Sequence, residues 1–147
     1  MADGKIAKLP LVAALVALGG LLDAIYLTIH HYNAEPVPCG AGFDCEMVLT
    51  SAWAEIGGIP LAAFGAAAYF AAFALSLLTA FGDERMWKIF GVLVTLMAFF
   101  SGWLVFLQAY RIGAFCQYCL ISAGTTLTLF IIFLISMAVR RRPSAVG

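Results

Sequence analysis

Four long apolar stretches dominate this sequence and restrict the chain to one kind of fold. They cover residues 9–30, 60–81, 89–110 and 116–139. Each can cross a hydrocarbon core of about 30 Å as a helix, which needs about 20 residues. They are apolar on every face and not at alternate positions, which excludes an outer-membrane β-barrel. We therefore predict an all-α integral membrane protein, a bundle of four transmembrane helices.

The composition excludes the main soluble alternatives. Of the 147 residues, 64% are hydrophobic and 11% are charged, whereas about 25% of a soluble domain is charged. The formal net charge is zero, so no overall positive field attracts nucleic acid. The first stretch is longer than the core of a secretory signal and lacks a small-residue cleavage site. We expect it to stay as the first helix of a single membrane domain.

The distribution of Lys and Arg predicts the orientation, because positively charged loops resist translocation. Seven basic residues lie at the N-terminus, between the second and third stretches and at the C-terminus: Lys5, Lys8, Arg85, Lys88, Arg140, Arg141 and Arg142. The other side carries only Arg111, and residues 32–59 contain no Lys or Arg. We expect both termini to be cytoplasmic. Residues 33–59 should form an outward cap with a short helix near residues 46–52.

All four cysteines fall on the predicted outer side. Cys39 and Cys45 lie in the cap, and Cys116 and Cys119 lie where the fourth stretch begins. Cysteines that only fill apolar space would be scattered over the chain. Outer compartments favour disulfides, so two disulfides in one of three connectivities are the default expectation.

The spacing of the cysteines adds a chemical prediction. Cys116-Gln-Tyr-Cys119 is a C-x-x-C motif at a helix N-terminus, where free N–H groups stabilise a thiolate and favour redox exchange. A structural bridge is the alternative, and the Gly-rich loop between Cys39 and Cys45 on its own indicates a structural staple. Together the pairs suggest a relay in which thiolates attack disulfides and pass on two electrons. Zinc is less favoured, because the five residues between Cys39 and Cys45 exceed the usual spacing of zinc ligands.

Further motifs accompany the cysteines. Ser51 and Trp53 follow Cys45 by six and eight residues, Gly57-Gly58-Ile59-Pro60 follows them, and Phe64, Gly65 and Tyr69 lie early in the second stretch. With the four spans and the final C-x-x-C, this combination resembles the vitamin K epoxide reductase family, particularly its prokaryotic members. The resemblance covers roughly residues 15–133.

The resemblance implies a membrane thiol oxidoreductase that reduces a quinone. Cys119 would react with the quinone, Cys116 would exchange disulfides with Cys45, and Cys39 would receive the attack of a reduced thioredoxin-like partner. The oxidised partner could then place disulfides in secreted proteins. Since the sequence ends shortly after Arg142, we expect this partner to act in trans. The implied location is a prokaryotic inner or plasma membrane, with the cysteines on its extracytoplasmic side.

The resemblance also suggests which residues surround the quinone. Ser51 matches a Ser or Thr beside the family's active site, and Trp53 matches an aromatic residue that supports the cap helix. Residues that could line the pocket are Cys119, Ser51, Phe64, Tyr69, Phe115 and Tyr118. The alternatives are a helix cap for Ser51, and bundle packing or an interfacial belt for the aromatic residues.

Two positions depart from the vertebrate members of the family. These carry an Asn in the second span and a Tyr four residues after the last cysteine, where this chain aligns Leu61 and Ala123. The differences favour a thiol oxidase that uses menaquinone or ubiquinone over an enzyme that reduces vitamin K epoxide.

Asp23 is unusual because an ionisable side chain inside a membrane span is costly and is by default a functional candidate. It could make a polar contact with Tyr26, Thr28 or another helix, or it could donate a proton near the quinone. His30 and His31 lie at the outer end of the same span and could titrate near neutral pH, although a wetted helix end is favoured for both.

Two other functions, and one other family with the same reaction, are compatible with parts of the pattern. A four-span structural or adhesion protein would hold its cap with inert disulfides. A metal-binding or transport protein is disfavoured, because Asp23 and Gln108 are the only carboxylate and amide side chains within the spans apart from Gln117 at the very start of the fourth. An unrelated bacterial four-span thiol oxidase usually has its two cysteine pairs in the reverse order.

Overall fold

The computed structural model describes residues 4–141 and contains the four predicted long helices. They are α1 (Gly4–Asn33), α3 (Leu61–Ala80), α4 (Glu84–Leu107) and α5 (Gln117–Arg141). A π-helical turn, η2 (Gln108–Ile112), extends α4. Each helix is long and apolar enough to cross a membrane, which confirms the predicted all-α membrane fold. Of the predicted cytoplasmic charges, Arg142 lies outside the described residues, as do the side chains of Lys5 and Arg141.

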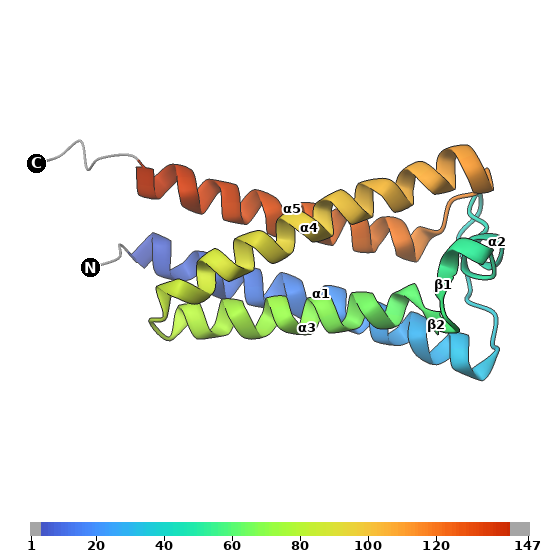
Figure 1. Cartoon of the computed structure of the whole chain (residues 1–147), viewed down its shortest axis with the longest axis horizontal. Coiled ribbons are helices and arrows are strands. Elements are labelled where there is room, and N and C mark those ends of the chain that lie inside the picture. The colour runs from blue at the N-terminus through green and yellow to red at the C-terminus, as the bar shows by residue number, and fades with distance from the viewer. Residues whose placement is uncertain (1–3, 142–147) are drawn as a thin grey trace, which may run out of the picture.

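The four helices form an elongated bundle in which α1 and α4 each pack against both α3 and α5. The start of α1, the turn from α3 to α4 and the end of α5 lie at one end of the bundle, and the cap lies at the other (Figure 1). The three basic segments therefore share one end, as the orientation argument requires. Which compartment that end faces remains a prediction.

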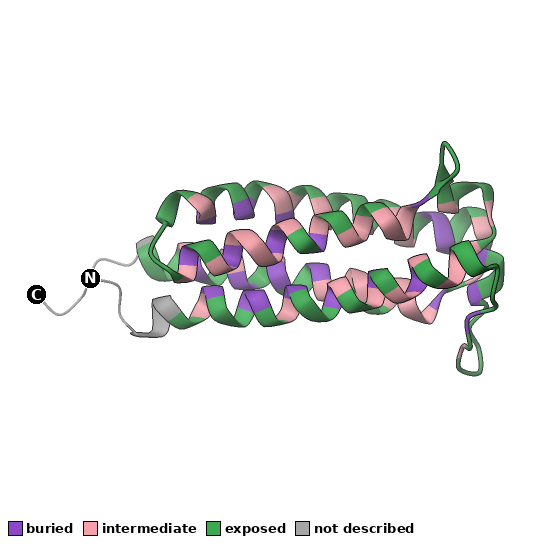
Figure 2. Ribbon diagram, turned by 90° about the horizontal axis from the view of Figure 1, so that it is seen from below, coloured by how far each residue is buried: buried purple, intermediate pink, exposed green. Residues whose placement is uncertain are grey.

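The core lies along the inner faces of the helices, and their outer faces are exposed (Figure 2). Small residues of α1, Ala13, Ala17 and Ala24, belong to this core and let neighbouring helices approach closely. Trp87 stacks on Phe90 and donates its indole N–H to Ser136 Oγ at 2.9 Å. Many large apolar side chains remain exposed on the outer faces, which suits a surface covered by lipid.

Gly20 provides a test of this packing, because a Cβ atom there would overlap the ring of Tyr69. That ring is buried and held by hydrogen bonds from its hydroxyl. We expect Gly20→Ala to lower the free energy of unfolding by about 1–3 kcal/mol through overpacking. Gly19→Ala is the matched control, since a Cβ at Gly19 meets nothing within 4 Å. Thermal unfolding in detergent measures both, and equal shifts would contradict the packing.

The cap connects α1 to α3 and has little regular structure. It contains α2 (Cys45–Leu49), the 3-10 turn η1 (Ala52–Ala54) and a hairpin of β1 (Glu55–Ile56) and β2 (Ile59–Pro60). Gly57 and Gly58 form the hairpin turn with φ of 61° and 84°, values that favour glycine.

The predicted cap helix exists, but its bounds differ from residues 46–52. The Asp44 carboxylate accepts a hydrogen bond from the Met47 N–H at 3.1 Å, so α2 starts at Cys45. It ends at Leu49 because Ser51 is extended, with ψ of 158°, and its hydroxyl donates to the Val48 carbonyl. Side chains that bond to the backbone compete in this way with a continuing helix.

Candidate functional site

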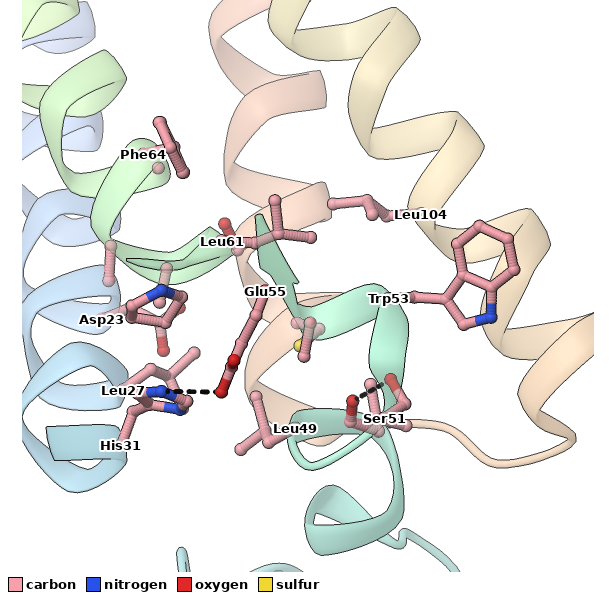
Figure 3. Close-up of a pocket in the computed structure, with 18 of the residues that line it drawn as sticks. Asp23, Leu27, His31, Leu49, Ser51, Trp53, Glu55, Leu61, Phe64 and Leu104 are labelled. Carbon is pink, nitrogen blue, oxygen red and sulfur yellow. Dashed lines mark hydrogen bonds and ion pairs between the residues drawn. The ribbon is translucent and has the colours of Figure 1, made fainter. Parts of the chain in front are cut away.

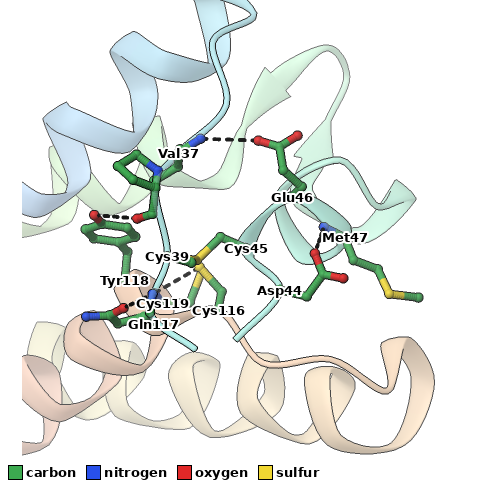
Figure 4. The surroundings of a disulfide bond; sticks show 12 residues. Val37, Cys39, Asp44, Cys45, Glu46, Met47, Cys116, Gln117, Tyr118 and Cys119 are labelled. Carbon is green, nitrogen blue, oxygen red and sulfur yellow. Dashed lines mark hydrogen bonds between the residues drawn. A yellow bond between two sulfur atoms is a disulfide. The ribbon is translucent and has the colours of Figure 1, made fainter. Parts of the chain in front are cut away.

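Hydrogen bonds fasten the cap to the start of α5. The Asp44 N–H donates to the Phe115 carbonyl, and the Gly40 N–H donates to Gln117 Oε1, both at 2.9 Å. The Tyr118 hydroxyl donates to the Pro38 carbonyl at 2.9 Å (Figure 4). The two cysteine pairs, far apart in sequence, are thereby held side by side.

All four cysteines meet in one cluster between the cap and α5. Cys39 and Cys45 form a disulfide with Cα atoms 6.2 Å apart, and Cys116 and Cys119 are free thiols. Cys45 and Cys116 are 1% and 0% exposed and share a buried cluster, with Cys39 and Cys119 packed against it. The interior of the cluster therefore contains one cysteine of each pair, and its partly exposed rim contains the other.

Cys116 occupies the residue before α5, where its sulfur caps the helix. The Cys119 N–H points to Cys116 Sγ at 3.4 Å. Hydrogen bonds from the Cys119 side chain and from the backbone N–H groups of Cys119 and Tyr118 lower the pKa of Cys116, although burial and the Asp23 carboxylate oppose this. The arrangement favours a nucleophilic thiolate at Cys116.

Gln108 is a site residue that the sequence analysis did not identify. It begins the π-turn η2, is 3% exposed and accepts the Cys116 N–H through Oε1 at 2.9 Å. Its own carbonyl accepts the Gly113 N–H, where a left-handed residue ends the turn. Short π-helical segments often occur at functional sites. Here the segment turns a buried amide toward the backbone of a cysteine.

We expect Gln108→Leu to leave the Cys116 N–H buried without an acceptor, which costs about 1–3 kcal/mol of unfolding free energy. Gln117→Leu is the matched control, because Gln117 also accepts a backbone N–H but in an exposed bond. Chemical or thermal unfolding of the two variants compares the losses. A larger loss for Gln117→Leu would contradict the role given to Gln108.

A cavity of about 1060 Å³ lies beside the cysteine cluster, between the helices and the cap. Its walls include Asp23 and Leu27 of α1, Leu61 and Phe64 of α3, Leu104 of α4, and Ser51 and Trp53 of the cap (Figure 3). Largely apolar cavities of this size with a few polar groups are typical of sites for small organic molecules. Of the four cysteines, Cys119 is the one that lines the cavity.

The structure brings together most of the predicted pocket residues, but not all of them. Ser51, Phe64, Tyr69 and Cys119 line the cavity, whereas Phe115 and Tyr118 do not. Tyr118 instead binds the cap through Pro38 and packs near the Tyr26 ring, with centroids 5.4 Å apart. Phe115 contributes its carbonyl to the cap, and its side chain is exposed. These two residues fasten the cap to the bundle.

A group of hydroxyls forms the polar part of the α5 wall. The Tyr69 hydroxyl lies 2.9 Å from Ser122 Oγ and 2.8 Å from Thr126 Oγ1, and it donates to the Ser122 carbonyl at 2.6 Å. Ser122 and Thr126 line the cavity together with Cys119. The sequence carries a signal for this wall, because residues three and seven positions after Cys119 share its helix face.

Within residues 8–140, whose side chains the structure describes, no group of three or more His, Cys, Asp or Glu side chains could hold a metal ion. Cys39 and Cys45 are joined to each other, so their sulfurs are not free to ligate zinc.

One comparison with known protein families matches most of the chain. The model of the vitamin K epoxide reductase family matches residues 11–134. The match extends from α1 into α5 and includes both cysteine pairs and the cavity beside them.

Proposed function

Because this chain belongs to the vitamin K epoxide reductase family and is a membrane oxidoreductase, we propose that it reduces a membrane quinone with electrons from an extracytoplasmic protein thiol. The thiol donor would be a thioredoxin-like protein, which leaves oxidised and can then introduce disulfides elsewhere. The net reaction is the oxidation of a dithiol coupled to the reduction of a quinone to a quinol.

The position of Cys119 is the observation that carries this proposal. Cys119 lines a large and mostly apolar cavity, while its neighbour Cys116 lies in the buried cluster with Cys45. A quinone with a polyprenyl tail stays in the bilayer and its thiol donor is soluble, so electrons must cross between them at the membrane surface. A cysteine cluster at the end of a membrane bundle meets that requirement.

The burial of the cap disulfide supports a direction for the electrons. Cys39 is partly exposed and Cys45 is buried, so an incoming thiolate can attack Cys39 and release the Cys45 thiolate. Cys45 then attacks Cys116 of a Cys116–Cys119 disulfide and releases the Cys119 thiolate. A second partner thiolate resolves the mixed disulfide at Cys39, and Cys39 in turn displaces Cys116 from Cys45. The partner loses two electrons, and Cys116 and Cys119 gain them.

The cavity walls bear on which quinone is used. Leu61 and Ala123, the positions at which vertebrate relatives carry Asn and Tyr, both line the cavity. The side chains of these two residues are apolar and cannot donate a hydrogen bond to a quinone oxygen. This supports a menaquinone or ubiquinone substrate and a role in disulfide formation over the reduction of vitamin K epoxide.

The test is anaerobic reduction of menadione by the purified protein with dithiothreitol as donor, in detergent. We expect turnover well above the rate without protein. Absence of turnover with menadione and with a short-chain ubiquinone, in folded protein, would overturn the proposal. A Cys39–Cys45 bridge that also resists exchange would then favour the four-span structural protein.

A further inference from the structure

Two buried polar atoms in the described part of the chain have no hydrogen-bond partner, and both belong to α1. They are Asp23 Oδ2 and His30 Nδ1. A buried polar atom without a partner is costly, so such atoms are rare and call for a ligand, a solvent molecule or a chemical role. Thr28 does not satisfy Asp23, because its hydroxyl donates to the Ala24 carbonyl at 2.7 Å.

Both residues line the cavity that Cys119 also lines. They are seven residues apart, which puts them on one face of α1 and roughly 10 Å apart along its axis. Leu27 lies between them on the same wall, and Asp23 and Leu27 both point toward the cavity (Figure 3). The polar groups therefore form an ordered series along one side of the cavity.

The outer end of this series reaches water through Glu35. His30 Nδ1 lies 3.7 Å from Glu35 Oε2, and the Glu35 side chain is 58% exposed. The other acidic groups of the cap are engaged elsewhere. Glu46 accepts the Val37 N–H at 3.2 Å, and Glu55 pairs with His31 at 3.0 Å.

Quinone reduction creates a demand for protons inside the cavity. With Cys116 as a thiolate and Cys119 as a thiol, the cysteines supply two electrons and one proton. In the balanced reaction, a quinone, the Cys116 thiolate, the Cys119 thiol and one further proton give a quinol and the Cys116–Cys119 disulfide. The second proton must come from another group that touches the bound quinone or from water that reaches it.

We propose that Asp23 donates this second proton to the quinone oxygen, and that His30 and Glu35 return a proton to Asp23 from the outer surface. The inference rests on the proposed function and extends it to the proton path. Water in the cavity would carry the proton over the two helical turns between His30 and Asp23, since the cavity is large and polar atoms border it there.

Asp23→Asn is the first variant, assayed with menadione and dithiothreitol. We expect kcat to fall about 10²-fold, as for loss of a general acid, with little change in KM. Asp23→Glu should retain most of the activity. Formate should restore part of the turnover of Asp23→Ala, which a purely structural aspartate would not allow. Glu84→Gln, the same kind of neutralisation at the other end of the bundle, should leave turnover unchanged.

His30 and His31 provide a matched pair that does not depend on the folding of Asp23 variants. We expect His30→Gln to slow turnover about 10-fold and His31→Gln to slow it clearly less. An equal loss in the two variants would overturn the position of His30 in the path. An unchanged kcat in folded Asp23→Asn would overturn the role of Asp23 but not the proposed function. Absence of turnover in the wild type would instead contradict the proposed function.

Discussion

Replacing Cys119 with alanine is expected to reduce quinone turnover to the uncatalysed rate, a loss of at least about 10³-fold, whichever thiol donor is used. Cys119 is the cysteine on the cavity wall, and Cys116 beside it is fully buried. Without Cys119, no thiol contacts the occupant of the cavity. Anaerobic absorbance assays with dithiothreitol and with reduced thioredoxin measure the loss.

Two comparisons separate this chemical loss from a general effect on the site. Cys116→Ala also stops turnover, but its Cys119 can still add to one quinone, so mass spectrometry should detect a one-to-one adduct that Cys119→Ala does not form. Ser122→Ala alters the same wall one turn further along α5 and should retain measurable turnover. Substantial turnover by Cys119→Ala would show that another group reacts with the quinone.

The membrane fold could be predicted from the sequence because the constraint is strong. A backbone that crosses lipid must satisfy its hydrogen bonds within the segment, so a long stretch that is apolar on all faces has few alternatives to a helix. The N-terminal position of the C-x-x-C on α5 followed from the start of the fourth apolar stretch, and the structure confirms it. The position of the three basic segments at one end of the bundle could also be predicted, because the chain returns to the same side after every second span.

The details of the site depended on contacts that local sequence does not encode. Phe115 and Tyr118 adjoin the cysteines in sequence, but neither lines the cavity. Tyr118 binds the cap through its hydroxyl, and Phe115, which precedes α5, binds it through its backbone carbonyl. Gln108 reaches Cys116 because of a π-turn, for which an apolar sequence carries no distinct signal. Ser122 and Thr126 could have been found by following the helix face of Cys119.

Asp23 shows where sequence analysis stops and geometry is needed. The sequence left open a polar contact and a proton-donating role, because both place a carboxyl group inside a span. The structure describes an Oδ2 atom without a partner on a cavity wall, which supports the second alternative. The two roles differ in the position of one carboxylate oxygen atom, and the hydropathy of the sequence does not give that position.

Cys39→Ala is expected to separate the two thiol donors. Turnover with dithiothreitol should stay within about three-fold of wild type, because a small dithiol can reduce the Cys116–Cys119 disulfide directly through the cavity that Cys119 lines. Turnover with reduced thioredoxin should fall at least about 10²-fold, since Cys45 is buried and a protein thiol cannot reach it. The ratio of the two rates is the measurement, and it cancels differences in the amount of folded enzyme.

The control for this prediction must loosen the cap while keeping all four thiols. Gln117→Ala does so, because it removes the acceptor of the Gly40 N–H next to Cys39. If Cys39 acts only by holding the cap in place, Gln117→Ala should reproduce the donor-selective loss. If Cys39 receives the partner's thiolate, Gln117→Ala should raise KM for thioredoxin and largely retain kcat. Equal losses with both donors in Cys39→Ala would contradict the order of the relay, because electrons from a small dithiol would then also have to enter at the cap disulfide.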